Sequence, residues 1–375
     1  MNKPAEVVIV GAGIVGAACA LELSTEGLRV LVIDESFISA GSTGAAMGHI
    51  VVMDDSEAQF AITRYSQILW DDMREQFPAS VEFDSCGTLW VAADEEEMRE
   101  VRRKFDYYRE RGVNAEILDS QQVRDAEPHL RAPLAGGLRV PGDSVIYPPC
   151  AAEFLLQKAR ALGARIIQGQ PVVAIGKGAA RLADGTVFAA GFIVNAAGQS
   201  APKLSPGINI KPRKGHLVIT DRYPNFLQHQ VVELGYLKSA HSLTSDSVAF
   251  NVQPRKTGQI LIGSSRQYGA ENSAVDESIL SRMLQRAFEY MPDLNSLSAI
   301  RVWTGFRPAT PDKLPLIGPS PQDPSVLVAA GHEGLGITTS LATAKLICAQ
   351  ILGQRPAIPI QPYLPSRQMA AEAHV

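Results

Sequence analysis

The stretch from Glu6 to Ser36 constrains the fold more than any other part of the chain. Its apolar run Val7–Val10 predicts a short buried strand, and the glycine-rich sequence GAGIVG follows at once. A helix is predicted from there to Gly27, and a second apolar run ends at Asp34, 18 residues after Gly16. Strand, glycine turn, helix, strand and acid in this order predict a βαβ unit that binds the pyrophosphate of a dinucleotide.

Each residue of this motif has a separate expected role. Gly11 permits the tight turn, Gly13 lets the pyrophosphate approach the backbone, and Gly16 lets the helix pack on the strand. Asp34 is expected to bind ribose hydroxyls, and Glu35 follows it with no Arg or Lys close by, which argues against the 2′-phosphate of NADP. The alternative is a glycine-rich turn in an α/β core that binds no ligand.

The segments after this unit favour FAD over NAD. Residues 40–50, AGSTGAAMGHI, are small and polar, which suits a loop lying against a large flat ligand. A second nucleotide fingerprint is not found, because GKGAAR at 176–181 lacks the third glycine and NAAGQS at 195–200 lacks the spacing. A single dinucleotide site is therefore expected.

Bulk properties exclude several classes of function. The net charge of −4 gives no basic footprint for nucleic acid. The longest uncharged apolar stretch, Val7–Leu21, is shorter than the roughly 20 residues of a membrane span and holds three glycines. The cysteines are scattered and have no metal-type spacing, so no metal site is expected: Cys19, Cys86, Cys150 and Cys348. They predict reduced thiols in a cytoplasmic protein. They also predict that this chain holds no iron–sulfur cluster by itself.

The order of the segments predicts a mixed α/β (α+β) fold with two interleaved domains. Nucleotide-type patterns recur near both ends and in the middle, with β-rich sequence between them. The prediction is a Rossmann-type FAD-binding domain formed by residues 1–80, 145–205 and 300–375. A β-sheet-rich substrate domain is predicted from residues 81–144 and 206–299.

A second glycine-rich turn lies near the carboxyl end, in GHEGLGITTSLATAKLI. Gly331, Gly334 and Gly336 would expose backbone N–H groups, and the helix predicted from about Ile337 would point its positive end the same way. Negative charge on a reduced flavin would be stabilised there. A strand–helix turn without a ligand is the alternative, and His332 either contacts the flavin or fills the turn.

The sequence WTGFRPATPDKLPLIGP places Arg307 among prolines, glycines and apolar residues. A guanidinium is always charged and is rarely held in such surroundings without an anion. Asp312, five residues further on, could supply that anion in a turn-rich segment. The other candidate is the carboxylate of a substrate.

Several of these motifs together resemble the D-amino-acid oxidase superfamily, in its glycine and sarcosine oxidase branch. They are the first fingerprint with Asp34, GSTGAAMGHI, IVNAAG at 193–198, GFRPATPDKLPLIG and AAGHEGLGITTSLATAKLI. The ending GHEGLGITT is most similar to the FAD-carrying β-subunits of multi-subunit amine dehydrogenases, namely D-hydroxyproline dehydrogenase, opine dehydrogenases and hydrogen cyanide synthase. The resemblance spans nearly the whole chain.

The resemblance implies an FAD domain beside a β-sheet substrate domain. It implies that Arg307, in the G-x-R-P motif, holds the substrate carboxylate, and that Tyr236 or Phe250 serves as an aromatic lid. Some members attach FAD through a histidine after the first βαβ unit, but Ala45–Met47 stand there and His49 is displaced, so non-covalent FAD is expected. The residues expected to contact FAD are Gly11, Gly13, Ile14, Val15, Gly16, Asp34, Glu35, Ser42, Thr43, Gly48, His49, Val172, Val173, Ala196, Ala197, Gly198, Gly331, His332, Glu333, Gly334, Leu335, Gly336, Ile337 and Thr338.

Three functions remain open from the sequence. The first is an FAD-dependent amino- or imino-acid dehydrogenase that oxidises a CH–NH bond to an imine. It would be the catalytic subunit of a complex with a ferredoxin-like iron–sulfur chain, with D-hydroxyproline or D-proline favoured as substrate. The second is a self-contained glycine- or sarcosine-type oxidase that uses oxygen. The third is a flavin-binding subunit without activity of its own.

Overall fold

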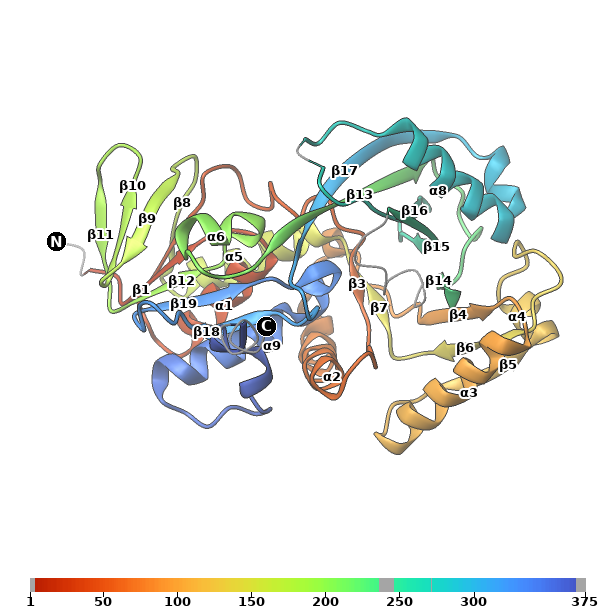
Figure 1. Cartoon of the computed structure of the whole chain (residues 1–375), viewed down its shortest axis with the longest axis horizontal. Coiled ribbons are helices and arrows are strands. Elements are labelled where there is room, and N and C mark those ends of the chain that lie inside the picture. The colour runs from red at the N-terminus through yellow and green to blue at the C-terminus, as the bar shows by residue number, and fades with distance from the viewer. Residues whose placement is uncertain (1–3, 236–245, 271, 369–375) are drawn as a thin grey trace.

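A mainly parallel six-stranded sheet organises one side of the molecule (Figure 1). The computed structural model describes residues 4–235, 246–270 and 272–368. β1 lies inside the sheet between β12 and β2, and all four of its residues are buried, as is usual for a parallel strand covered on both faces. The strands, in order across the sheet, are β18 (Leu316–Pro319), β19 (Val326–Ala330), β12 (Phe192–Asn195), β1 (Val7–Val10), β2 (Val30–Ile33) and β8 (Arg165–Ile167).

Helices cover one face of this sheet and a small sheet covers the other. The largest hydrophobic core joins β1 and β2 to α1 (Ile14–Thr25), α5 (Pro148–Ala161) and α9 (Gly336–Leu352), with α1 in contact with both other helices. A smaller core on the opposite face meets a three-stranded sheet in the order β11 (Val187–Ala189), β10 (Ala179–Leu182) and β9 (Val172–Gly176).

An eight-stranded sheet organises the other side of the molecule. Its strands, in order, are β17 (Ala299–Ala309), β13 (Lys211–Thr220), β16 (Ile260–Arg266), β15 (Ser247–Pro254), β14 (Gln230–Glu233), β4 (Thr88–Ala92), β6 (Gly136–Val140) and β5 (Glu116–Asp119). Three helices pack on it: α8 (Glu277–Tyr290) on β15 and β16, and α3 (Glu95–Glu110) and α4 (Ser120–Ala126) on the β5–β6 end. The remaining α-helices of the described residues are α2 (Glu57–Met73) and α6 (Ala201–Leu204).

Short elements connect the two sides. β3 (His49–Ile50) pairs with β7 (Ser144–Val145) between the two large sheets (Figure 1). The short 3-10 helices are η1 (Arg74–Gln76), η2 (Ala79–Val81), η3 (Gly198–Ser200), η4 (Pro292–Ser296), η5 (Glu333–Leu335) and η6 (Gln361–Tyr363). The mixed α/β architecture predicted from the sequence is confirmed.

One predicted boundary between the domains is wrong. Residues from 300 onward were expected in the FAD-binding domain, but β17 pairs with β13 over almost its whole length in the eight-stranded sheet. Because β17 is the edge strand, the missing N–H of Pro308 breaks no ladder on its outer side. The long β13–β17 ribbon extends from the eight-stranded sheet toward the six-stranded sheet (Figure 1), and Arg307 lies on its strand β17.

The segment Glu333–Leu352 is long and apolar enough, by length and composition, to cross a membrane. However, 67% of its most apolar window is buried inside the molecule. Its helix α9 packs against α1 and α2, as the core helix of a globular protein does.

Candidate active site

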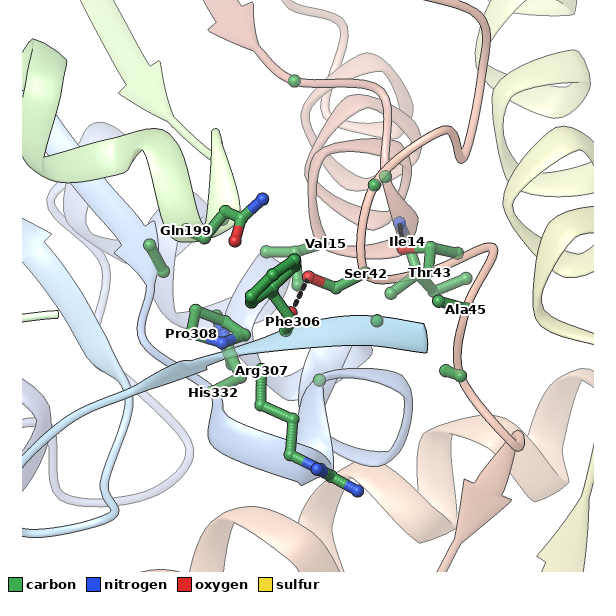
Figure 2. A pocket seen from close by; sticks show the side chains of 18 of the residues that line it. Ile14, Val15, Ser42, Thr43, Ala45, Gln199, Phe306, Arg307, Pro308 and His332 are labelled. Atoms are coloured by element: carbon green, nitrogen blue, oxygen red, sulfur yellow. Dashed lines mark hydrogen bonds between the residues drawn. The ribbon is translucent and has the colours of Figure 1, made fainter. Parts of the chain in front are cut away.

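A cavity of about 570 Å³ lies where the six-stranded sheet meets the eight-stranded sheet (Figure 2). The carboxyl ends of β1, β2 and β19 reach it from one side, and β13, β15, β16 and β17 reach it from the other. Ligands of open α/β sheets bind at this edge of the sheet. The predicted residues that line the cavity are Gly11, Gly13, Ile14, Val15, Asp34, Glu35, Ser42, Thr43, Gly48, His49, Val172, Ala196, Ala197, Gly198, Arg307, His332, Glu333, Gly334, Gly336 and Ile337.

The glycine turn between β1 and α1 leaves no room for side chains. Gly11 has φ +110°, and a Cβ there would lie 2.5 Å from the carbonyl oxygen of Ala196. A Cβ on Gly16 would lie 1.9 Å from the carbonyl oxygen of Gly11, so this glycine lets α1 pack on β1. Gly13 is the N-cap of α1, which directs the positive end of the helix dipole at the cavity.

Asp34 stands at the end of β2, beside this turn. Its Oδ2 accepts the N–H of Ala12 at 2.6 Å, and its Oδ1 accepts the N–H of Ser36 at 2.8 Å. These two bonds fix the carboxylate at the cavity wall and join the glycine turn to the loop that follows β2. That loop closes over the turn, because Thr43 Oγ1 accepts the N–H of Ile14 at 3.0 Å.

The second glycine-rich turn forms the wall beside α9. Glu333 adopts φ 52°, and Gly334, Gly336 and Ile337 follow it along the cavity. Glu333 is ion-paired with the buried Arg213, which also donates to the hydroxyl of Tyr268 at 2.9 Å. The N-terminus of α9 is therefore held rigidly, with its unpaired backbone N–H groups and dipole near the cavity.

The two predicted histidines are neutral groups at the cavity wall. Burial lowers the pKa of His332 to about 3, and its Nε2 lies 3.0 Å from Thr343 Oγ1. Burial, and then the charge of Arg307, lower the pKa of His49 to about 4. The Nε2 atom of His49 is buried with no hydrogen-bond partner within the described ranges, whereas the Nε2 atom of His332 has a partner in Thr343.

Arg307 extends from β17 on the side opposite to Phe306 and Pro308 (Figure 2). Its Nη1 donates to the carbonyl oxygen of Ser265 at 2.9 Å. The carboxylate of Asp312 is bound through both oxygens by another residue, Arg367, at 2.6 and 3.0 Å. The alternative partner for Arg307 that the sequence left open is thus engaged elsewhere, and the guanidinium lines the cavity.

Phe250 does not form the expected aromatic lid. Phe250 is fully buried on the other face of the eight-stranded sheet, where its ring stacks on Tyr290 at 4.9 Å. Successive side chains of a strand point to opposite faces, and the neighbouring Asn251 is the one that lines the cavity. The assignment of Phe250 is therefore wrong, and Tyr236 lies outside the described residues.

Five residues expected at the cofactor lie away from the cavity. Val173 points to solvent, because Val172 occupies the inward position of β9. The hydroxyl of Thr338 donates to the carbonyl oxygen of His49 at 2.8 Å and ties α9 to β3. The other three pack against the protein instead of the cavity: Gly16 against the backbone of Gly11, Gly331 against Thr310, and Leu335 against a hydrophobic core.

The structure also adds residues that the sequence reasoning missed. Gln199 and Ser200 directly follow the glycine of IVNAAG, and Phe306 precedes Arg307, so extending each motif by one or two positions would have found them. The carbonyl oxygen of Phe306 accepts the hydroxyl of Ser42 at 2.6 Å (Figure 2). For Asn251, the only sequence signal was that a polar residue lies inside a mostly apolar strand.

Comparison with known proteins identifies the family. The family described as FAD dependent oxidoreductase matches residues 6–350. The chain belongs to this family. It is 27% identical to hydrogen cyanide synthase subunit HcnC of Pseudomonas aeruginosa, over 98% of this chain and 97% of that one. It is 26% identical to the glycine oxidase of Geobacillus kaustophilus, over 98% of both chains.

Solved structures agree with this assignment. The crystal structure of the Geobacillus kaustophilus glycine oxidase superimposes with a TM-score of 0.87 and covers 98% of this chain and 99% of that one. L-proline dehydrogenase from P. horikoshii, at 23% identity, shares the fold with a TM-score of 0.87 over 99% of both chains. The family resemblance expected from the sequence is confirmed, and the chain is an FAD-dependent oxidoreductase.

The residues present fit an FAD. The glycine turn is a cradle that any Cβ would fill, Asp34 lies at its rim, and Thr43 and Ser42 hold the adjoining loop. When bound, FAD supplies the acceptor for a hydride. The N-termini of α1 and α9 supply fixed positive potential at two ends of the cavity. No cluster of side chains that could hold a metal ion occurs among the described residues.

Proposed function

We propose that this chain oxidises the CH–NH bond of an amino or imino acid to an imine, with Arg307 binding the substrate carboxylate. The observation that carries this proposal is the position of Arg307, which reaches the FAD cavity from the substrate sheet. A guanidinium offers two parallel N–H groups to a carboxylate, and each charge-assisted bond contributes about 1.5–3 kcal/mol. A substrate anchored in this way would have its Cα inside the cavity.

The residues around Arg307 are suited to hydride transfer without proton abstraction from Cα. Burial lowers the pKa of His49 and of His332, which makes both weak bases, and His216 bonds to Ser265 and to the backbone of Asp276 instead of facing the cavity. If the amine arrives neutral, no base is needed at Cα. The chain's contribution is then binding, orientation and the positive end of α9.

We propose further that the chain is the catalytic β-subunit of a dehydrogenase complex. One relative is by name a subunit of hydrogen cyanide synthase, and a relative from Synechocystis is by name a bifunctional protein. The four cysteines are free thiols, and no three of them gather with other metal-ligating side chains among the described residues, so an iron–sulfur relay would have to be carried by a partner chain. A cyclic imino acid, D-hydroxyproline or D-proline, is the favoured substrate.

A self-contained oxidase is the second candidate. It is favoured by the glycine oxidase of Geobacillus kaustophilus, which matches over 98% of this chain at 26% identity. A subunit that only relays electrons is disfavoured by the arginine at the cavity.

Anaerobic reduction of the flavin tests the proposal. The purified holoprotein is mixed under nitrogen with D- and L-amino acids, both configurations of proline and 4-hydroxyproline, glycine, sarcosine and opines, and its absorbance near 450 nm is followed. We expect bleaching by at least one carboxylate-bearing amine, and strongest bleaching by a D-imino acid. Absence of bleaching by every compound would contradict amine oxidation, whereas bleaching by glycine or sarcosine with oxygen uptake would support the oxidase. Dye reduction without oxygen uptake would support the dehydrogenase.

A further inference from the structure

Two polar side chains of the eight-stranded sheet, Asn251 and Ser264, line the cavity. Asn251 on β15 is 5% exposed and Ser264 on β16 is 2% exposed, and both line the cavity. Within the part of the chain that the structure describes, Asn251 Oδ1 and Ser264 Oγ are buried with no hydrogen-bond partner. A buried polar group left unsatisfied destabilises a protein by about 1–3 kcal/mol. Such atoms at a cavity wall therefore point to a bound molecule that satisfies them.

Two neighbouring polar side chains, Gln253 and Ser265, differ from these two because each makes a hydrogen bond within the protein and neither lines the cavity, although Gln253 Oε1 is also buried without a partner among the described residues. Gln253, on the same face of β15, donates through Nε2 to the carbonyl oxygen of Met47 at 3.0 Å. Ser265 bonds to His216, with 2.9 Å between its Oγ and the imidazole Nδ1. The wall between them is apolar: a Cβ on Gly263 would lie 3.0 Å from Leu217 and 3.2 Å from Met47. Asn251 and Ser264 are thus a polar pair in an apolar wall.

This pair lies within reach of a small molecule held by Arg307. Asn251 is directly opposite Gly263 in the β15–β16 ladder, Ser264 is the next residue, and the carbonyl oxygen of Ser265 accepts the Arg307 Nη1 bond. One residue step along a strand is about 3.3 Å, and paired residues are about 5 Å apart. The guanidinium and the polar pair are therefore separated by a distance that one small amino acid can bridge.

We propose that Asn251 and Ser264 bind a hydroxyl group on the substrate, and that they select a hydroxylated imino or amino acid over its deoxy counterpart. This inference rests on the proposed function. Both side chains are uncharged, and a hydroxyl can donate to Asn251 Oδ1 while it accepts from the Ser264 hydroxyl. A site that hydrogen-bonds a substrate hydroxyl rejects the analogue lacking it, because its own buried polar groups are then left unpaired.

The test compares matched substrate pairs in the holoenzyme. Anaerobic flavin reduction is measured for 4-hydroxyproline against proline, and for serine against alanine, each pair in the configuration that reduces wild type best. The variants are Asn251→Ala and Ser264→Ala. The control is Ser24→Ala, which removes a buried, unpartnered hydroxyl from α1, away from the cavity. FAD content is measured for each protein.

We expect wild type to prefer the hydroxylated member of the pair in kcat/KM by about tenfold or more. Asn251→Ala and Ser264→Ala should each reduce this ratio by about tenfold. Ser24→Ala should leave the ratio unchanged. If one variant fails to bind FAD, the other still decides the outcome.

Other results would overturn the inference while leaving the proposed function intact. A wild-type kcat/KM ratio near one between the hydroxylated and the deoxy substrate would mean that Asn251 and Ser264 bind water. An equal loss of kcat/KM on both substrates in the variants would mean that these residues bind a group common to both substrates, such as the amine. If no amine reduces the flavin, the proposed function fails. The inference is then judged by titrating the flavin absorbance with tetrahydrofuran-2-carboxylate and its 4-hydroxy derivative, where equal affinity in wild type would overturn it.

Discussion

At the residue scale, Arg213, Arg307 and Arg367 each have a different partner, although Arg213 and Arg307 lie opposite each other on neighbouring strands. Arg213 on β13 is opposite Arg307 on β17, and Arg213 is ion-paired with Glu333. Arg307 bonds to the backbone carbonyl of Ser265, and Arg367 neutralises Asp312. The positive charge of Arg307 acts on the cavity wall, because it contributes to the lowered pKa of His49.

Non-covalent FAD is a prediction at this scale. His49 lies at the cavity, where its imidazole is held neutral, and a neutral imidazole could in principle carry a covalent flavin. The chain has Ala45 and Ala46 at the position where a linking histidine is expected from the resemblance. Precipitation with trichloroacetic acid should therefore release all flavin into the supernatant. Flavin that stays in the protein pellet, and is released when His49 is replaced by Gln, would contradict this.

Single residues were predictable from the sequence where a motif fixed the backbone. Gly11, Gly13 and Asp34 lie where the βαβ pattern placed them, because the spacing of the motif sets the geometry. Phe250 was misplaced because nothing in a single sequence gives the face to which a strand residue points until its partners are known. A shift by one residue moves a side chain to the other side of the sheet.

At the element scale, two glycines of the first turn should respond differently to the same substitution. A Cβ on Gly16 would collide with the backbone of Gly11, so Gly16→Ala should push α1 off β1 and destabilise the FAD-free protein by roughly 1–3 kcal/mol. A Cβ on Gly13 would lie 3.0 Å from the Thr43 hydroxyl at the cavity, so Gly13→Ala should mainly weaken FAD binding.

Thermal denaturation of the FAD-free variants and fluorescence titration with FAD measure the two effects separately. Gly27→Ala is a control for alanine at a glycine far from the cavity, where a Cβ would meet no atom within 4 Å. Its positive φ of 83° adds local strain, so only its FAD affinity should match wild type. A Gly16→Ala protein that melts like wild type would show that the close contact between α1 and β1 is not needed.

Helices and most strands followed the hydrophobic pattern, but β17 did not. The prolines of WTGFRPATPDKLPLIGP were interpreted as marks of a turn-rich segment, but only Pro308 falls within β17, where it is compatible with a strand because β17 is at the edge of its sheet. Edge position depends on the strand order, which local sequence does not give. The predicted boundary at 300 came instead from the recurrence of nucleotide-type patterns, which does not show that β17 pairs with β13.

At the scale of the whole molecule, a buried carboxyl joins the two sides. Asp143 lies between β6 and β7, and its Oδ1 accepts from Gln67 of α2 at 2.8 Å and from the backbone N–H of Val52 at 3.2 Å. Burial raises the pKa of the Asp143 carboxyl from its ordinary value of 3.8 to about 7. The folded protein therefore holds this proton more tightly than the unfolded chain.

The stability conferred by the Asp143 proton is fully present below pH 4 and is lost as the pH rises through 7. Asp143→Asn keeps an oxygen acceptor and cannot ionise. Its free energy of unfolding relative to wild type should rise between about pH 4 and pH 7, by at most about 1.4 kcal/mol per pH unit, and level off above that. Thermal denaturation across this range, with the exposed Asp125→Asn as control, measures the effect. A difference that is constant with pH would contradict it.

The interleaving of the two sides could be predicted from the order of sequence patterns, but the cavity between them could not. Its walls combine residues that are distant in the chain, such as Val15, Asn251 and Arg307. Only the three-dimensional meeting of the sheets brings Asn251 and Ser264 to this cavity. Their position was therefore outside the reach of motif reasoning.

The central claim is that Arg307 binds a substrate carboxylate at bound FAD. The most direct measurement is the apparent Kd of the best imino-acid substrate in anaerobic flavin reduction, for wild type and for Arg307→Lys, with the carboxamide of the same substrate as a second ligand. A lysine replaces the two-pronged contact by a single point charge, so we expect the Kd for the acid to rise about tenfold or more while FAD stays bound. The carboxamide should bind wild type weakly and be little affected by the substitution. An unchanged Kd for the acid in Arg307→Lys would contradict the account.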